Sequence, residues 1–116
     1  MRKAALSTAA VALVAAAAVP PSTGAATTHT VKLGEYFYRP ARLVIRRGDR
    51  VRFVNVGHIA HTVADSTKSG AIRSRIIKPR PLAHGRSQTV RFTRRGTVYY
   101  VCTFHPSLMR GRIVVR

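Results

Sequence analysis

The carboxyl-terminal part of the chain contains the run Val98-Tyr-Tyr-Val-Cys102-Thr-Phe-His105-Pro-Ser-Leu-Met109. Its first five residues form a nearly continuous apolar segment, which is typical of a strand in the core of a β-sandwich. The last eight residues of the run, from Cys102 to Met109, contain a thiol, an imidazole and a thioether. The run therefore predicts a core strand that leads directly into a group of metal-binding side chains.

The chain upstream of this run contains several short β-prone stretches separated by glycine turns. Residues 51–56 alternate in part, with Val51 and Phe53 facing one way and Arg52 and Val54 the other, and residues 89–93 alternate again. Residues 65–88 are polar and basic, and we expect a long connection there that holds at most one weak strand or one turn of helix. No segment has a sustained helical period, so the pattern predicts an all-β sandwich with a single domain. The remaining predicted strands are 30–33, 43–45 and 113–115.

Composition excludes several classes of site. The chain has 116 residues, 21 Lys+Arg, 3 Asp+Glu and one Cys, which gives a formal charge of +18. One Cys excludes an intramolecular disulfide framework, a CxxC redox pair and a four-Cys zinc site. Three acids leave little material for hydrolysis by a carboxylate pair or for a calcium site.

Residues 1–26 have the features of a secretory signal peptide. Arg2 and Lys3 precede an Ala/Val/Leu-rich run over 4–19, and small residues follow the Pro20-Pro21 break. The run is shorter than the roughly 20 apolar residues of a spanning helix, which argues against an uncleaved membrane anchor. We therefore predict export to the periplasm, the cell envelope or the medium, and a domain over 27–116 whose net charge falls from +18 to +16 without Arg2 and Lys3.

Export restricts what Cys102 can be, since a lone thiol is a liability in oxidising surroundings. It is expected to be buried, paired with another chain or bound to a metal. Two imidazoles, a thiolate and an axial thioether form the ligand set of a blue-copper electron-transfer site. Cys102, His105 and Met109 could supply three of these groups. Either His58 or His61 could supply the fourth.

The mature chain resembles the small cupredoxins, above all the amicyanins and then the plastocyanins and pseudoazurins. The resemblance extends over nearly all of it. The segments that carry it are Phe37-Tyr-Arg-Pro40, Leu43-Val-Ile45, Arg47-Gly-Asp-Arg-Val51, Phe53-Val-Asn55, His61-Thr-Val63, Gly96-Thr-Val-Tyr-Tyr100, the Cys–His–Met loop and Gly111-Arg-Ile-Val-Val115.

The resemblance implies a Greek-key β-sandwich that binds one copper and carries single electrons outside the cytoplasm. It implies His61, Cys102 and His105 as equatorial ligands and Met109 as the axial ligand. His105 and Met109 are separated by three residues, where amicyanin-like loops have two and plastocyanin-like loops have four. The axial bond length, and with it the potential and the spectrum, therefore does not follow from the resemblance.

Residues near these ligands are expected to orient them or to form a docking surface. Asn55, Thr62 and Thr103 are candidates for hydrogen bonds that orient the ligands. Phe104, Pro106 and Leu108 are expected to surround the exposed edge of His105 as an apolar patch for redox partners, as in the family.

The strongly basic charge predicts attraction to an acidic docking face on a redox partner, or to an anionic envelope surface. We expect a monomer and no catalytic activity, because the ligand set leaves no open position for a substrate. An alternative function is copper storage, delivery or sensing without electron shuttling. Specific nucleic-acid binding is not expected, because aromatic residues are not interleaved with the basic clusters.

Overall fold

Eight strands build the part of the protein that the structure, a computed structural model, describes, residues 25–116. The predicted signal over 1–26 lies outside these residues except for Ala25 and Ala26. No helix of the described part is long and apolar enough to cross a bilayer. The strands are β2 (Thr28–Gly34), β3 (Phe37–Arg39), β4 (Arg42–Ile45), β5 (Arg50–Asn55), β6 (Ala64–Ser66), β7 (Ser87–Arg91), β8 (Gly96–Val101) and β9 (Arg110–Val115).

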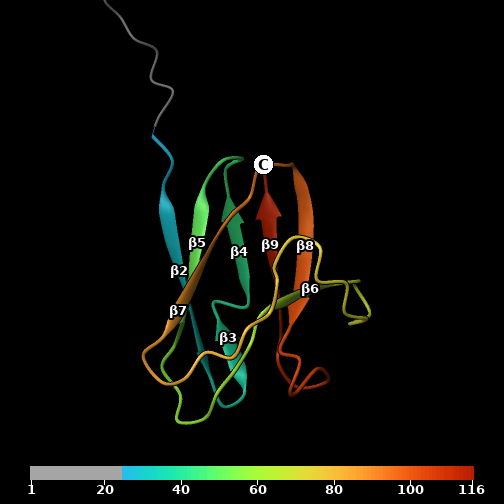
Figure 1. The fold of residues 1–116 in the computed structure, drawn as a ribbon. Coiled ribbons are helices and arrows are strands. Elements are labelled where there is room, and N and C mark those ends of the chain that lie inside the picture. Colours follow the sequence, from blue (N-terminus) through green and yellow to red (C-terminus); the bar gives the residue numbers. More distant parts are fainter. Residues whose placement is uncertain (1–24) are drawn as a thin grey trace, which may run out of the picture.

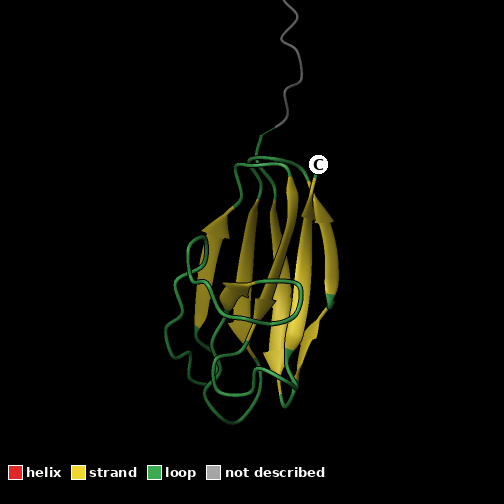
Figure 2. Cartoon of the chain, turned by 90° about the vertical axis from the view of Figure 1, so that its right-hand side faces the viewer, coloured by secondary structure: helices red, strands yellow, loops and turns green. Residues whose placement is uncertain are grey.

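Two four-stranded sheets face each other, with the orders β3-β2-β5-β7 and β4-β9-β8-β6 (Figures 1 and 2). The chain crosses between the sheets several times, and two pairs are parallel, β2 with β5 and β4 with β9. The predicted all-β Greek-key sandwich is confirmed. The short strands β3 and β6 were not predicted.

Alternation along the strands creates the core between the sheets. Val51 and Phe53 are fully buried, whereas Arg52 between them is exposed. The ring of Tyr100, on β8, packs edge-on against Tyr38 of β3 and Phe53 of β5, with ring centroids 4.7 and 5.3 Å apart. Such pairs stabilise by about 0.5–1.5 kcal/mol beyond their buried area, so these rings tie the two sheets together.

The loops at the two ends of the sandwich differ in composition. One end carries the turn between β4 and β5, the connection from β7 to β8, and Arg116 (Figure 1). We call it the basic pole, because it carries the exposed arginines Arg46, Arg47, Arg50, Arg91, Arg94, Arg95 and Arg116. The opposite end carries the β2–β3 turn, the 56–63 loop and the loop between β8 and β9 (Figure 1). We call it the metal end, because all four predicted ligands lie there.

Candidate metal centre

The loop between β8 and β9 brings the three carboxyl-terminal candidates to one place. Cys102 directly follows β8, and its amide donates to the Met109 carbonyl at 3.2 Å. The amides of His105 and Met109 close two turns inside the loop, onto the carbonyls of Cys102 and His105 at 3.1 and 3.0 Å. The loop therefore returns to its starting point, and Cys102 and Met109 are both fully buried.

His61 reaches this position from a different part of the chain. It forms an isolated bridge with Leu82, through two backbone hydrogen bonds of 3.1 and 2.8 Å. Its side chain is fully buried, and its Nδ1 lies 4.0 Å from Cys102 Sγ. His58, the other upstream candidate, is exposed and lies parallel to the His84 ring at 6.3 Å.

His105 lies at the border between this buried pair and the surface. Its ring centroid is 5.8 Å from that of His61 and 4.6 Å from that of Tyr36, which it meets edge-on. Within residues 25–116, no three His, Cys, Asp or Glu side chains are grouped closely enough to hold a metal by themselves. The structure thus brings His61 and Cys102 into contact, and His105 lies beside them against Tyr36.

Hydrogen-bond donors surround the Cys102 thiol. The Thr62 amide lies 3.5 Å from Sγ and the Thr62 hydroxyl 3.8 Å from it. The Thr103 amide donates to that hydroxyl at 2.8 Å, and Tyr38 OH donates to the Thr62 carbonyl at 2.6 Å. Thr62 and Thr103 therefore lie where the sequence analysis expected orienting residues. Donors aimed at a sulfur fix its position in the site.

Asn55 orients the metal end indirectly. Its side-chain amide donates to the carbonyls of Ile59 and Leu82 at 2.8 and 2.7 Å, and its Oδ1 accepts from the Gly57 amide at 2.8 Å. These bonds hold the 56–61 loop to the segment that pairs with His61. Asn55 thus fixes the backbone around the histidine, and we find no contact with the thiol.

Glu35, which the sequence analysis did not single out, faces the other nitrogen of His61. Its Oε1 accepts from the amides of His58 and Ile59 at 2.7 and 2.9 Å, and His61 Nε2 lies 3.4 Å away. The Ile59 amide is the largest cause that holds the pKa of Glu35 below its usual value, against partial desolvation. Since a carboxylate only accepts, this contact favours the tautomer with the proton on Nε2 and the lone pair on Nδ1, toward Cys102.

The carboxylate of Glu35 occupies the space that a side chain at Gly57 would need. A Cβ there would lie 2.5 Å from Glu35 Oε1. Carboxylate partners of metal-bound imidazoles are common, so the scarcity of acids in this chain could have drawn attention to Glu35.

Apolar side chains surround the exposed edge of His105. Phe104, at 51% exposure, has its ring centroid 6.5 Å from that of His105, and Leu108 is 66% exposed. Tyr36 and Ile59 add 47% and 43% exposed apolar side chains from two other loops. We call Tyr36, Ile59, Phe104 and Leu108 the apolar rim. Phe104 and Leu108, with the exposed Pro106, were expected there from the sequence, whereas Tyr36 and Ile59 were not.

This donor set fits copper by its chemistry. A buried thiol supplies soft sulfur, which Cu(I) favours, and an imidazole lone pair aimed at it supplies the nitrogen that Cu(II) favours. Hydrogen-bonded neighbours fix both groups, as metal sites require. The loop backbone brings the fully buried Met109 back to Cys102, and the His105 ring lies 5.8 Å from that of His61.

Residues 25–116 match the family described as copper binding proteins, plastocyanin/azurin family. The chain is 30% identical over 85 residues to amicyanin-alpha of Methylorubrum extorquens (strain ATCC 14718 / DSM 1338 / JCM 2805 / NCIMB 9133 / AM1), covering 73% of this chain and 69% of that protein.

Two solved structures have a similar fold. A reduced amicyanin variant superposes with a TM-score of 0.66 at 29% identity, covering 77% of this chain and 82% of that one. A purple cupredoxin from Nitrosopumilus maritimus superposes with a TM-score of 0.70 at 23% identity, and the match covers 76% of this chain and 99% of that one. The chain belongs to the plastocyanin/azurin family of copper-binding proteins and is a small blue-copper cupredoxin that binds one copper ion per chain.

Proposed function

We propose that this cupredoxin carries single electrons between extracytoplasmic proteins, with copper held by His61, Cys102, His105 and Met109. The observation that supports this most directly is the buried pair of Cys102 Sγ and His61 Nδ1, 4.0 Å apart within a hydrogen-bonded frame. A bound copper supplies a one-electron couple between Cu(I) and Cu(II).

The protein's own groups keep this site rigid and dry. Thr62 directs its amide at the sulfur, while Glu35 and Asn55 hold the loop that carries His61. Cys102, Met109 and His61 are fully buried, so water is excluded from three of the four proposed ligands. A fixed, mixed ligand set serves both oxidation states with little rearrangement, which favours fast electron exchange.

His105 is the proposed point of electron entry and exit. It is the only proposed ligand that is not fully buried, and it lies within the apolar rim. A partner that covers this rim would approach the metal through the imidazole edge. The resemblance to amicyanin supports a redox-protein partner, and we propose an acidic docking face on it and a monomeric carrier.

The proposed role includes neither catalysis nor residence in the cytoplasm. Four protein ligands would close the copper site to substrates, in contrast to catalytic metal sites with an open position. We propose that residues 1–26 direct export, so that the carrier acts in the periplasm, at the envelope or outside the cell.

The test is a visible absorption spectrum of the copper-loaded protein and of its Cys102→Ser variant. We expect an intense thiolate-to-copper band that a mild reductant bleaches and an oxidant restores, and no such band in the variant. A colourless protein, or pale copper unaffected by the substitution, would refute Cys102 as a ligand.

Reversible cycling separates electron transfer from copper storage or delivery. A blue protein that exchanges electrons slowly, but passes its copper to a chelating acceptor, would favour storage or delivery.

A further inference from the structure

Arginines crowd the end of the sandwich opposite the copper site. The turn after β4, the segment from β7 to β8 and the last residue meet there, because Gly48 donates to the Phe92 carbonyl at 2.7 Å and Arg47 to the Arg116 carbonyl at 2.8 Å. Seven exposed arginines result: Arg46, Arg47, Arg50, Arg91, Arg94, Arg95 and Arg116. Clusters that are far apart in the sequence thus form one basic pole.

The acid at this pole, Asp49, is only 6% exposed and does not face solvent. Its carboxylate accepts from the amides of Thr27 and Arg46 at 3.0 and 3.1 Å and lies 2.9 Å from His29 Nε2. Among residues 25–116, no Lys or Arg side chain forms an ion pair with a carboxylate. The positive charge of the pole is therefore not neutralised within the described domain.

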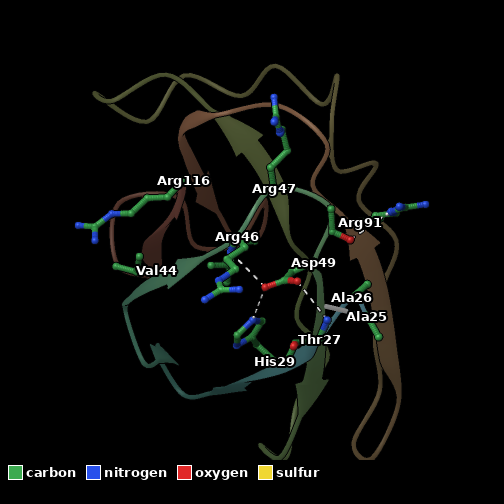
Figure 3. A pocket seen from close by; sticks show the side chains of 12 residues that line it. Ala25, Ala26, Thr27, His29, Val44, Arg46, Arg47, Asp49, Arg91 and Arg116 are labelled. Atoms are coloured by element: carbon green, nitrogen blue, oxygen red, sulfur yellow. Dashed lines mark hydrogen bonds and ion pairs between the residues drawn. The ribbon is translucent and has the colours of Figure 1, made fainter. Parts of the chain in front are cut away.

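The side chains at the pole suit a broad surface and not a small ligand. Four of them, Arg46, Arg47, Arg91 and Arg116, line a hollow of about 560 Å³ beside Asp49. Figure 3 shows Arg47, Arg91 and Arg116 pointing away from one another at its edge, while only Arg46 lies over His29 and Asp49. A clamp for a single anion needs converging guanidinium groups, whereas diverging ones reach many phosphates spread over an extended surface.

The pole is too far from the copper to guide a partner to it. Strand β8 runs from Gly96 at the pole to Val101 at the metal end, about 20 Å at roughly 3.3 Å per residue. The Debye length at 0.1 M salt is only about 10 Å. The metal end itself carries the apolar rim, the acidic Glu35 and the exposed Arg110, which donates to the Pro106 carbonyl at 2.9 Å. The two ends can therefore bind different things at the same time.

We propose that the basic pole adsorbs this protein to an anionic lipid bilayer and leaves the metal end facing away from it. The described chain begins at this pole, where Arg50 donates to the Thr27 carbonyl at 2.9 Å. The preceding sequence holds the predicted export signal, so a chain crossing a membrane would present this end to the lipid. The adsorption does not depend on electron transfer, but the availability of the metal end rests on the proposed function.

Two charge-matched variants of the full chain, recovered from the exporting cell, test the proposal. One replaces Arg47, Arg94, Arg95 and Arg116 at the pole with Gln, and the other replaces Arg42, Arg80, Arg86 and Arg112 elsewhere. Each loses four positive charges. Binding to vesicles of phosphatidylcholine with phosphatidylglycerol is measured by sedimentation, with pure phosphatidylcholine as the neutral control. Equal melting temperatures show that both variants fold.

We expect wild-type protein to bind the anionic vesicles and not the neutral ones. Because each basic side chain near an anionic surface contributes about fivefold, the loss of four at the pole should weaken binding about 600-fold, and the control variant should bind at most about fivefold more weakly. Equal losses in both variants would overturn the proposal, as would no binding by the wild type. Stronger retention on soluble polyphosphate than on vesicles, with the same dependence on the pole, would overturn the choice of a bilayer.

A second measurement tests how the bound protein is oriented on the vesicle. A neutral quinol should reduce the copper of vesicle-bound protein as fast as that of free protein, and slower reduction on vesicles would overturn the outward orientation. The Cys102→Ser variant should bind vesicles like the wild type. Loss of the blue colour with vesicle binding intact would therefore count against the copper ligand only.

Discussion

Two buried tyrosines at neighbouring positions in the core differ in one hydrogen bond. Tyr38 OH donates to the Thr62 carbonyl at 2.6 Å, whereas Tyr100 OH has no partner among the described residues. Burial raises the pKa of both phenols, so both stay protonated. The tyrosine hydroxyls therefore contribute unequally to stability, although both rings pack in the same cluster.

We predict that Tyr38→Phe lowers the free energy of unfolding by about 1–2 kcal/mol, because it leaves a buried carbonyl unpaired. Tyr100→Phe should leave it unchanged or raise it by up to about 1 kcal/mol, because it removes an unsatisfied hydroxyl. Urea unfolding of the two variants measures both effects, and each serves as the control for the other. Equal losses would contradict this assignment.

Glu35 is predicted to tune the copper potential through His61. Its negative charge lies 3.4 Å from Nε2 and favours the more positive Cu(II) state. Glu35→Gln keeps an acceptor for the His58 and Ile59 amides but removes the charge. The reduction potential should therefore rise by tens of millivolts, where about 59 mV corresponds to a tenfold change in the equilibrium constant of a one-electron couple.

Cyclic voltammetry measures the Glu35 effect, and an unchanged blue absorption band confirms that the site remains formed. Glu35→Ala is the comparison that also removes the loop acceptor, so its melting temperature should fall further than that of Glu35→Gln. An unchanged potential in both variants would show that the carboxylate does not act on the metal.

The candidate site could be predicted where its members are neighbours in the sequence. Cys102, His105 and Met109 stand within one loop, and their residue types alone suggest copper chemistry. Glu35 is 26 residues from His61, and Tyr36 meets His105 from the same distant turn. Only the pairing of strands brings that turn to the metal end, so no local pattern could indicate it.

Among the elements, the long connection from β6 to β7 is held by one carboxylate. Asp65 Oδ1 accepts from the amides of Ile76 and Ile77, both at 2.7 Å, and its carbonyl accepts from Arg73 and Ser74. Ile77 is fully buried by this arrangement. A polar, proline-containing segment is thereby fixed against the sandwich without regular secondary structure.

We predict that Asp65→Ala lowers the free energy of unfolding by about 2–4 kcal/mol, because two amides lose a charged acceptor. Asp65→Asn keeps an oxygen at the same position and should lose less than half of that. Chemical denaturation measures the totals, and hydrogen exchange should show faster exchange confined to residues 67–86 in the alanine variant. Exchange that increases uniformly would show a global effect instead.

Six of the eight strands could be predicted because their side chains alternate or form apolar runs. β3 and β6 have only three residues each, too few for any period, and β6 has the polar Asp65 and Ser66 buried in its pairing. The sheet orders could not be predicted, because the parallel pairs β2–β5 and β4–β9 join strands that no short turn connects.

At the scale of the whole molecule, Asp49 links stability to pH. The His29 side chain is the largest cause that lowers its pKa from 3.8 to about 2, followed by the Thr27 and Arg46 amides. A lowered carboxyl pKa stabilises the fold above the unfolded value, and this stabilisation is lost as pH falls through the folded value.

We therefore predict that the melting temperature of Asp49→Asn lies below that of the wild type at about pH 5. The difference should shrink as pH falls from 4 towards about 2. Differential scanning calorimetry at a series of pH values measures it, and the other carboxyl groups cancel because both proteins contain them. A difference that is undiminished at pH 2 would contradict the lowered pKa.

Residue 25 and the carboxyl terminus lie at the same end of the sandwich, away from the proposed ligands (Figures 1 and 2). A group attached at either point is therefore separated from His105 by the full length of the strands. A fusion partner, affinity tag or electrode linker could be joined to this domain without covering the electron-exchange surface. In a longer multidomain protein, the same geometry would place the neighbouring domain at one end of this sandwich and leave the redox centre exposed at the other.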